Sequence, residues 1–140
     1  MGIVQEFAKA FNARDVNGLL ACFTEHASYT DNFFGEHRGR DELRAMFERM
    51  FREGRDYLWQ MDTIVEAPTS AAAEWTFSYV VTDAVPRSTG RKVRFRGMSV
   101  FELQNGRVAR YREYFDTGVA LVQLGFAAES IAKVLSRRVP

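Results

Sequence analysis

The sequence is poor in the residues that would tie it to an extracellular, metal-binding or nucleic-acid-binding role. Its single cysteine, Cys22, excludes an internal disulfide, and a free thiol suits a reducing compartment. The only histidines, His26 and His37, are well separated and lack a neighbouring cysteine, which is not metal-ligand spacing. The 19 basic and 18 acidic residues nearly cancel, so there is no bulk charge to attract nucleic acid or an anionic membrane.

Long apolar runs and phosphate-binding loops are also missing. No run approaches the roughly 20 residues that cross a bilayer, and the N-terminus has no charged segment followed by an apolar one. Neither a Gly-rich phosphate loop nor a Gly-x-Ser-x-Gly nucleophile elbow occurs. We therefore expect a cytoplasmic protein that acts without nucleic acid or membrane partners.

What the chain has in abundance is aromatic side chains. Hydrophobic residues make up 46% of its 140 residues, and twelve of these are phenylalanine. This length predicts one domain over residues 1–140 with a core of its own. The aromatic content exceeds the need of a small core and favours an apolar cavity.

Hydrophobic spacing predicts helices first and strands afterwards. Apolar residues recur at helical spacing over 3–13 and 41–52, and Asp15 is a suitable N-cap for a short helix between them. A brief strand is expected over 27–30 and a loop over 31–40. The period then changes to two, and two short helices end the chain, an α+β arrangement. The expected strands are 57–66, 72–83, 92–104 and 107–116, and the helices are 117–124 and 128–138.

Two segments carry a family resemblance. The stretch Phe7–Asp31 (FAKAFNARDVNGLLACFTEHASYTD) resembles, without a gap, the start of a ketosteroid isomerase. The run Gly106-Arg107-Val108, leading to Arg112-Glu113-Tyr114-Phe115-Asp116, looks SnoaL-like. The chain thus resembles the nuclear transport factor two superfamily, which includes ketosteroid isomerases and SnoaL-like polyketide cyclases. The resemblance implies a cone-shaped, curled antiparallel sheet packed on N-terminal helices, with a cavity inside the cone.

Asp31 stands where the resemblance implies a proton-abstracting base; the alternative is an aspartate that caps a turn. The isomerases pair that base with a Tyr on the first helix and a protonated Asp on a central strand. Here those positions hold Phe7 and, depending on one gap, Met98 or Ser99, of which strand parity favours the inward Ser99. Because Phe cannot donate a hydrogen bond, efficient steroid isomerisation is not expected. Substitute donors could come from Tyr29, Tyr79, Tyr111 or Glu113.

Strand alternation assigns the cavity face independently of any family. One face of the expected strands is aromatic, and Glu113 is the carboxylate on it, whereas Val108 falls on the opposite face with Arg110 and Arg112. Desolvation should raise the pKa of Glu113 and make it a donor or general acid–base; pairing that only fixes the core is the alternative. The catalytic candidates are Asp31, Glu113 and Ser99. The substrate-binding candidates are Phe7, Tyr29, His37, Trp59, Trp75, Phe77, Tyr79, Phe101, Tyr111 and Phe115.

Three functions fit these residues. The first is an enzyme that uses a carboxylate base, without metal or cofactor, to isomerise, cyclise or hydrate a small apolar carbonyl-bearing or polycyclic molecule. The second is a binding module for an apolar ligand, and the third is a structural dimer domain whose aromatics fill the cone. Asp116 remains either a base on the last strand or a helix cap. The outward sheet face mixes apolar, aromatic and guanidinium groups and predicts a homodimer. This face carries Thr76, Ser78, Val80, Val100, Arg110, Arg112 and Tyr114.

Overall fold

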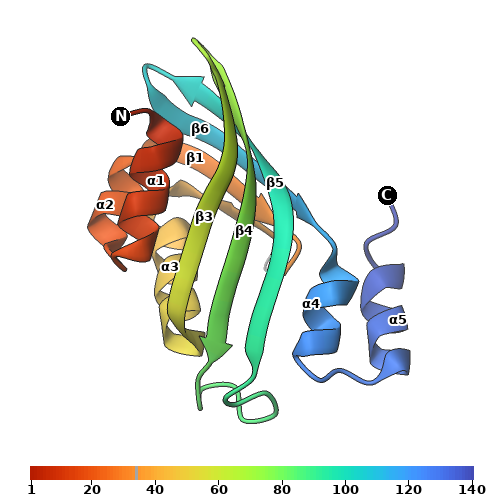
Figure 1. Cartoon of the computed structure of the whole chain (residues 1–140). Helices are drawn as coiled ribbons and strands as arrows, with labels where there is room; N and C mark the ends of the chain where they lie inside the picture. Colours follow the sequence, from red (N-terminus) through yellow and green to blue (C-terminus); the bar gives the residue numbers. More distant parts are fainter. Residues whose placement is uncertain (34) are drawn as a thin grey trace.

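The N-terminal helices form where their apolar spacing predicts them. The computed structural model describes residues 1–33 and 35–140. In it, α1 (Ile3–Asn12) buries Val4, Phe7 and Phe11. The next helix, α2 (Val16–Ala21), begins after Asp15, whose side chain accepts a 2.9 Å hydrogen bond from the Gly18 amide. Both helices lie against one side of the sheet (Figure 1).

The segment expected to be a loop over 31–40 contains a strand instead. The first strand, β1 (Phe23–Asp31), is longer than expected, and β2 (Gly35–Arg38) pairs antiparallel with it. Gly35 has a φ of 78°, a left-handed conformation that glycine adopts without steric cost. Position 34, also in the expected loop, lies outside the described residues. The next helix, α3 (Gly39–Glu53), buries the predicted apolar face.

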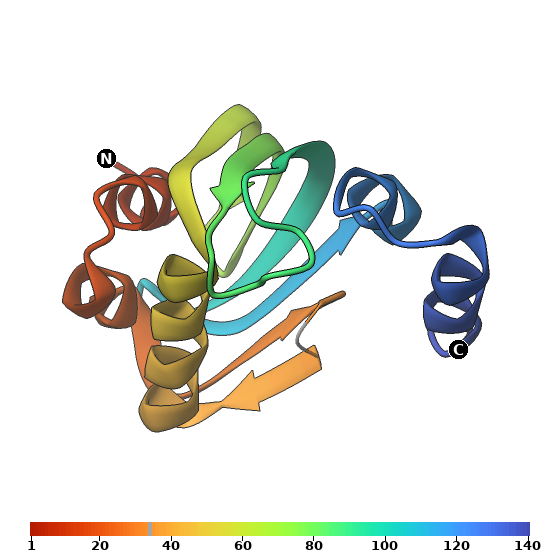
Figure 2. The same cartoon turned by 90° about the horizontal axis from the view of Figure 1, so that it is seen from below.

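A six-stranded sheet has the order β2-β1-β6-β5-β4-β3. Its long strands are β3 (Gly54–Ala67), β4 (Ser70–Val81), β5 (Lys92–Gln104) and β6 (Arg107–Phe115). They form an antiparallel meander, as predicted, whereas β1 pairs parallel with β6. The predicted α+β fold is confirmed, with one parallel pairing in a sheet expected to be wholly antiparallel. Seen from below, the sheet curls, with α3 at one side and α4 (Thr117–Gln123) at the other (Figure 2).

The predicted inward face holds along β4 and β5 and changes in β6. Val108 is fully buried, although alternation placed it outward. The register shifts between Glu102 and Leu103, so that Val108 lies opposite Leu103 while Arg110 lies opposite Glu102. Ala109 is the extra residue of this bulge, and an extra residue reverses parity on its far side. Tyr111 and Glu113 still face inward, as alternation predicted.

Two short helices follow β6. Asp116 accepts a 3.2 Å hydrogen bond from the Val119 amide and so caps α4 (Thr117–Gln123), as one of its two predicted roles requires. The Gln123 side chain links α4 to β5: it accepts a hydrogen bond from the Arg94 amide and donates one to the Arg94 carbonyl, both at 2.8 Å. The last helix, α5 (Ala128–Ser136), buries no residue and lies beyond α4 (Figure 2). None of the helices within the described ranges is long and apolar enough to cross a membrane.

Candidate functional site

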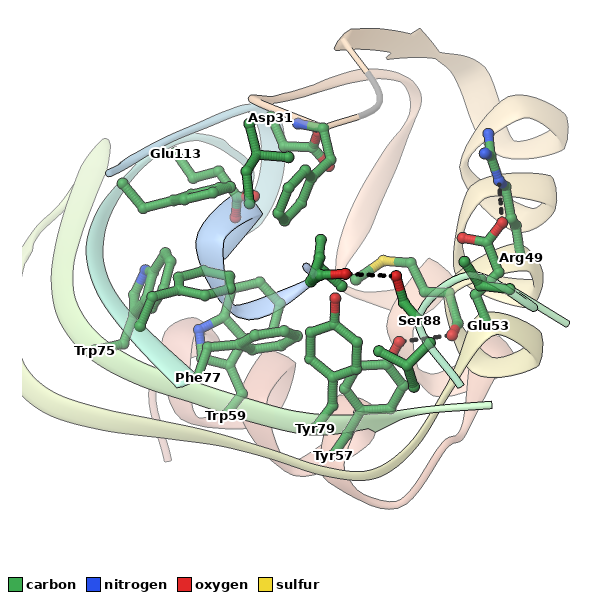
Figure 3. Close-up of a pocket in the computed structure, with 18 of the residues that line it drawn as sticks. Asp31, Arg49, Glu53, Tyr57, Trp59, Trp75, Phe77, Tyr79, Ser88 and Glu113 are labelled. Atoms are coloured by element: carbon green, nitrogen blue, oxygen red, sulfur yellow. Dashed lines mark hydrogen bonds and ion pairs between the residues drawn. The ribbon is translucent and has the colours of Figure 1, made fainter. Parts of the chain in front are cut away.

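A cavity of about 290 Å³ lies inside the curl of the sheet (Figure 3). Its walls come from the end of β1, the inward faces of β3 to β6, α3, the β4–β5 loop, and α4 with the residues around it. Apolar and aromatic side chains dominate this surface, as is usual for small-molecule sites. The aromatic members are Phe33, Tyr57, Trp59, Trp75, Phe77, Tyr79, Phe95, Phe115 and Phe126.

Two carboxyl groups line the same end of this apolar space. Asp31 ends β1 and is 4% exposed, and Glu113 lies on β6 and is 8% exposed. Figure 3 shows both side chains at the end of the cavity opposite Tyr57. The Oδ1 atom of Asp31 also accepts a 2.8 Å hydrogen bond from the Phe33 amide. Asp31 therefore caps a turn and faces the cavity, so the two interpretations of this residue are compatible.

The environment of Glu113 favours its protonated form. Burial raises the pKa of this carboxyl well above its ordinary value, and the nearby negative charge of Asp31 raises it further. The hydrogen bond from Tyr111 lowers the pKa, but by less. The predicted direction of the pKa shift is thus confirmed, and Glu113 is suited to donate a proton or a hydrogen bond near neutral pH.

A buried chain of hydrogen bonds ends on Glu113. The Tyr111 hydroxyl donates to Glu113 Oε2 at 2.5 Å, and Ser99 Oγ lies 2.8 Å from the same hydroxyl. The indole Nε1–H of Trp75 donates to Ser99 Oγ at 2.8 Å. Ser99 and Tyr111 are completely buried, so these hydrogen bonds reach Glu113 from the core side of the cavity wall.

The end of the cavity opposite the two carboxyl groups carries hydroxyl groups. The Tyr57 hydroxyl donates to the Met50 carbonyl at 2.6 Å, and Ser88 Oγ donates to the Leu124 carbonyl at 2.7 Å. Burial, with the charge of Glu53, raises the pKa of Tyr79 to about 12. Tyr79 therefore stays protonated, and its hydroxyl points into the cavity (Figure 3).

The structure brings together part of the predicted site. Asp31, Glu113, Trp59, Trp75, Phe77, Tyr79 and Phe115 line the cavity. Phe7, Tyr29, Ser99, Phe101 and Tyr111 are fully buried in the core and are not among the residues that line this cavity. The reason is close packing: the Phe7 ring, for example, has ring contacts with Phe23, Trp59, Phe101 and Tyr111. His37 lies on the edge strand β2, away from the cavity lining.

Sequence reasoning missed several lining residues. Phe95 and Val81 share the predicted inward faces, and Met50 belongs to the apolar face of α3, so signals for these three were present. Arg49 and Glu53 on α3 and Tyr57 on β3 also line the cavity. The positions of the remaining lining residues depend on loop paths and on where α4 docks, which periodicity does not reveal. These are Phe33, Val85, Ser88, Leu121, Leu124 and Phe126.

Comparison with known proteins agrees with this architecture. The family model described as a SnoaL-like domain matches residues 4–111. No curated protein matches the chain in sequence. A candidate polyketide cyclase from Xanthomonas campestris pv. campestris superposes with a TM-score of 0.78 at 21% identity, over 87% of this chain and 93% of that one.

Two further solved structures show the range of proteins with this fold. A hypothetical protein from Catenulispora acidiphila DSM 44928, with a ketosteroid isomerase-like fold and bound trimethylamine, has a TM-score of 0.78 at 16% identity, covering 91% and 95% of the two chains. An LEH-like epoxide hydrolase from M. tuberculosis has a TM-score of 0.72 at 20% identity, covering 98% and 94%. At such identities the likeness establishes the fold, and the chemistry must be argued from the site.

Proposed function

The chain belongs to the SnoaL-like domain family, and from this premise we propose that it is a cofactor-independent enzyme that moves a proton on a small carbonyl compound. The observation that carries this proposal is the pair of carboxyl groups, Asp31 and Glu113, at one end of an apolar cavity. Two such groups in one desolvated site do not both ionise readily, and environments that push their pKa values apart create an acid and a base.

The proposed reaction is enolisation. Ionised Asp31 takes a proton from the carbon next to the carbonyl, so that the C–H bond breaks and its electron pair forms a carbon–carbon double bond. Protonated Glu113 gives its proton to the carbonyl oxygen, which becomes the enol hydroxyl. The single negative charge moves from Asp31 to Glu113. Return of a proton at another carbon isomerises the substrate, and attack of the enol on a second carbonyl cyclises it.

The cavity also bears on substrate size. A cavity of about 290 Å³ lies at the small end of the range for ligand sites, about 300–1,000 Å³, which favours a small ring system. The aromatic walls favour a flat, apolar ring system. We therefore propose a mono- or bicyclic ketone, with the carbonyl at the Asp31–Glu113 end and any second polar group near Tyr79.

The test is proton exchange on 2-tetralone, a bicyclic ketone with acidic α-hydrogens. Wild-type protein in D2O should accelerate loss of its α-proton NMR signals over buffer, and Asp31→Asn should reduce that catalysis at least about 100-fold. Asn keeps the size and the turn-capping oxygen of Asp31 but removes the base.

Asp116→Asn is the matched control for this substitution. Asp116 also caps a backbone amide, that of Val119, but it does not line the cavity. Its variant should exchange 2-tetralone at the wild-type rate. Equal activity of wild type and Asp31→Asn would remove Asp31 from the mechanism. Tight binding of the ketone without exchange would favour the alternative function, a non-catalytic carrier of apolar ligands.

The outward face of the sheet supports a second proposal, that the protein is a homodimer. Tyr114 is 60% exposed and Met98 is 50% exposed on this face. Beside them, Glu102 forms ion pairs with Arg110 and Arg112. Aromatic, Met and Arg side chains are enriched at protein interfaces.

A further inference from the structure

The hydrogen bonds behind Glu113 have only one direction in which Trp75, Ser99 and Tyr111 all donate to one another or to Glu113. The Trp75 indole nitrogen is a donor and cannot accept, so Ser99 Oγ must accept from it. If Tyr111 instead donated to Ser99, the Ser99 proton would have no acceptor in this buried chain. Ser99 therefore donates to Tyr111, and Tyr111 donates to Glu113 Oε2. Buried polar groups are satisfied in this way in nearly all native structures.

This direction determines which oxygen of the Glu113 carboxyl carries the proton when the group is protonated. Its Oε2 atom accepts from Tyr111, which lies behind the cavity wall. A proton on the carboxyl then sits on Oε1, the oxygen that does not bind Tyr111. We propose that the directed chain from Trp75 through Ser99 and Tyr111 positions Glu113 so that its acidic proton is presented to the substrate. Ser99 and Tyr111 are thus positioning residues, and this inference rests on the proposed role of Glu113 as the proton donor.

Few charged groups act on the pKa of Glu113. Asp31 faces Glu113 from β1, and its negative charge favours retention of the Glu113 proton. Tyr29, also on β1, stacks on the Tyr111 ring with centroids 4.2 Å apart. Its hydroxyl approaches that of Tyr111 without hydrogen-bond geometry and has no such partner among the described residues. No cationic side chain in the described part of the chain is among the groups that shift the pKa of Glu113.

Tyr29 consequently provides a matched control for Tyr111. Both tyrosines are completely buried, and Phe in place of either removes one hydroxyl at the same depth. Tyr111→Phe deletes a hydrogen bond to the ionised form of Glu113, whereas Tyr29→Phe deletes none. Carbon NMR titration of the Glu113 carboxyl, assigned by its loss in Glu113→Gln, should show a pKa about one unit or more higher in Tyr111→Phe than in wild type. Tyr29→Phe should leave that pKa within about 0.2 units of wild type.

Ser99→Ala supplies an independent variant should Tyr111→Phe not fold. Losing the Ser99 donor weakens the Tyr111 hydroxyl as a donor, because linked hydrogen bonds strengthen one another. The Glu113 pKa should therefore rise in Ser99→Ala as well, by less than in Tyr111→Phe. A merely structural role would lower the melting temperature of these variants without moving the Glu113 pKa, and that result would overturn the inference.

The inference and the proposed function can fail separately. A Glu113 pKa that responds to Tyr111→Phe, in a protein that does not exchange the α-protons of 2-tetralone, supports the positioning chain and contradicts the enzyme. Exchange by the wild type with a pH profile that is unchanged in Tyr111→Phe supports the enzyme and overturns the positioning chain.

Discussion

Asp31 and Glu113 occupy adjacent parallel strands, each one residue beyond the paired residues Thr30 and Arg112, and both side chains line the same cavity. The parallel pairing of β1 with β6 is what brings them together, because these strands are far apart in the sequence. Two carboxyl groups at one end of an apolar cavity are the arrangement on which the proposed proton transfer depends.

Replacement of Glu113 by Gln should change how stability depends on pH. Its pKa is raised in the folded protein, so wild type loses stability as pH rises from the ordinary value of about 4.3 through the folded pKa. The slope in this range should be about 1.4 kcal/mol per pH unit. Glu113→Gln should remove this slope, as measured by urea unfolding at a series of pH values.

Glu129→Gln is the control for that experiment. It makes the same chemical change on α5, where the side chain is exposed. Its stability curve should run parallel to that of wild type. A Glu113→Gln curve with the same pH slope as wild type would mean that Glu113 is not buried as a protonated carboxyl.

Tyr79 should select substrates with a second polar group. Wild type should bind 6-hydroxy-2-tetralone about fivefold more tightly than 2-tetralone, which corresponds to one added hydrogen bond of about 1 kcal/mol. Tyr79→Phe should abolish this preference, as measured by calorimetry. Tyr57→Phe should retain it, because the Tyr57 hydroxyl is already used by the Met50 carbonyl. Preference lost in Tyr57→Phe and kept in Tyr79→Phe would reverse the assignment.

The homodimer proposal predicts a scattering mass of twice the 16.0 kDa chain at micromolar concentration. Tyr114→Glu should reduce the mass to that of one chain, since it buries a charge in the proposed interface. Val139→Glu makes a comparable change at a 75% exposed position near the C-terminus and should leave the dimer intact. A wild-type mass of 16.0 kDa would refute the proposal.

Much of the fold was accessible from local patterns in the sequence. The helices over α1 and α3 and the inward face of β4 follow from periodicity, because a buried face imposes its spacing on the chain. Glu113 could be placed among aromatics by alternation alone. The bulge at Ala109 and the parallel β1–β6 pairing could not, since both depend on contacts between distant segments.

The site was harder to predict than the fold. Alternation says that Ser99 and Tyr111 face inward, but not whether they touch the cavity or the core behind it. That distinction is made by α1, whose Phe7 packs against Tyr111, and by α4, whose docking on β5 places Leu121 in the wall. Ser99 thus sits where an isomerase-like donor was expected, yet it contacts Tyr111 and Trp75.

The most direct test of the Asp31–Glu113 pair needs no substrate. Carbon NMR titration should give a Glu113 pKa well above the ordinary value of about 4.3 in wild type, because of burial and of the Asp31 charge. In Asp31→Asn the charge is gone and the burial remains, so the Glu113 pKa should fall but stay above that value. A wild-type pKa at or below about 4.3, or a raised pKa that Asp31→Asn does not move, would contradict an acid–base pair in this cavity.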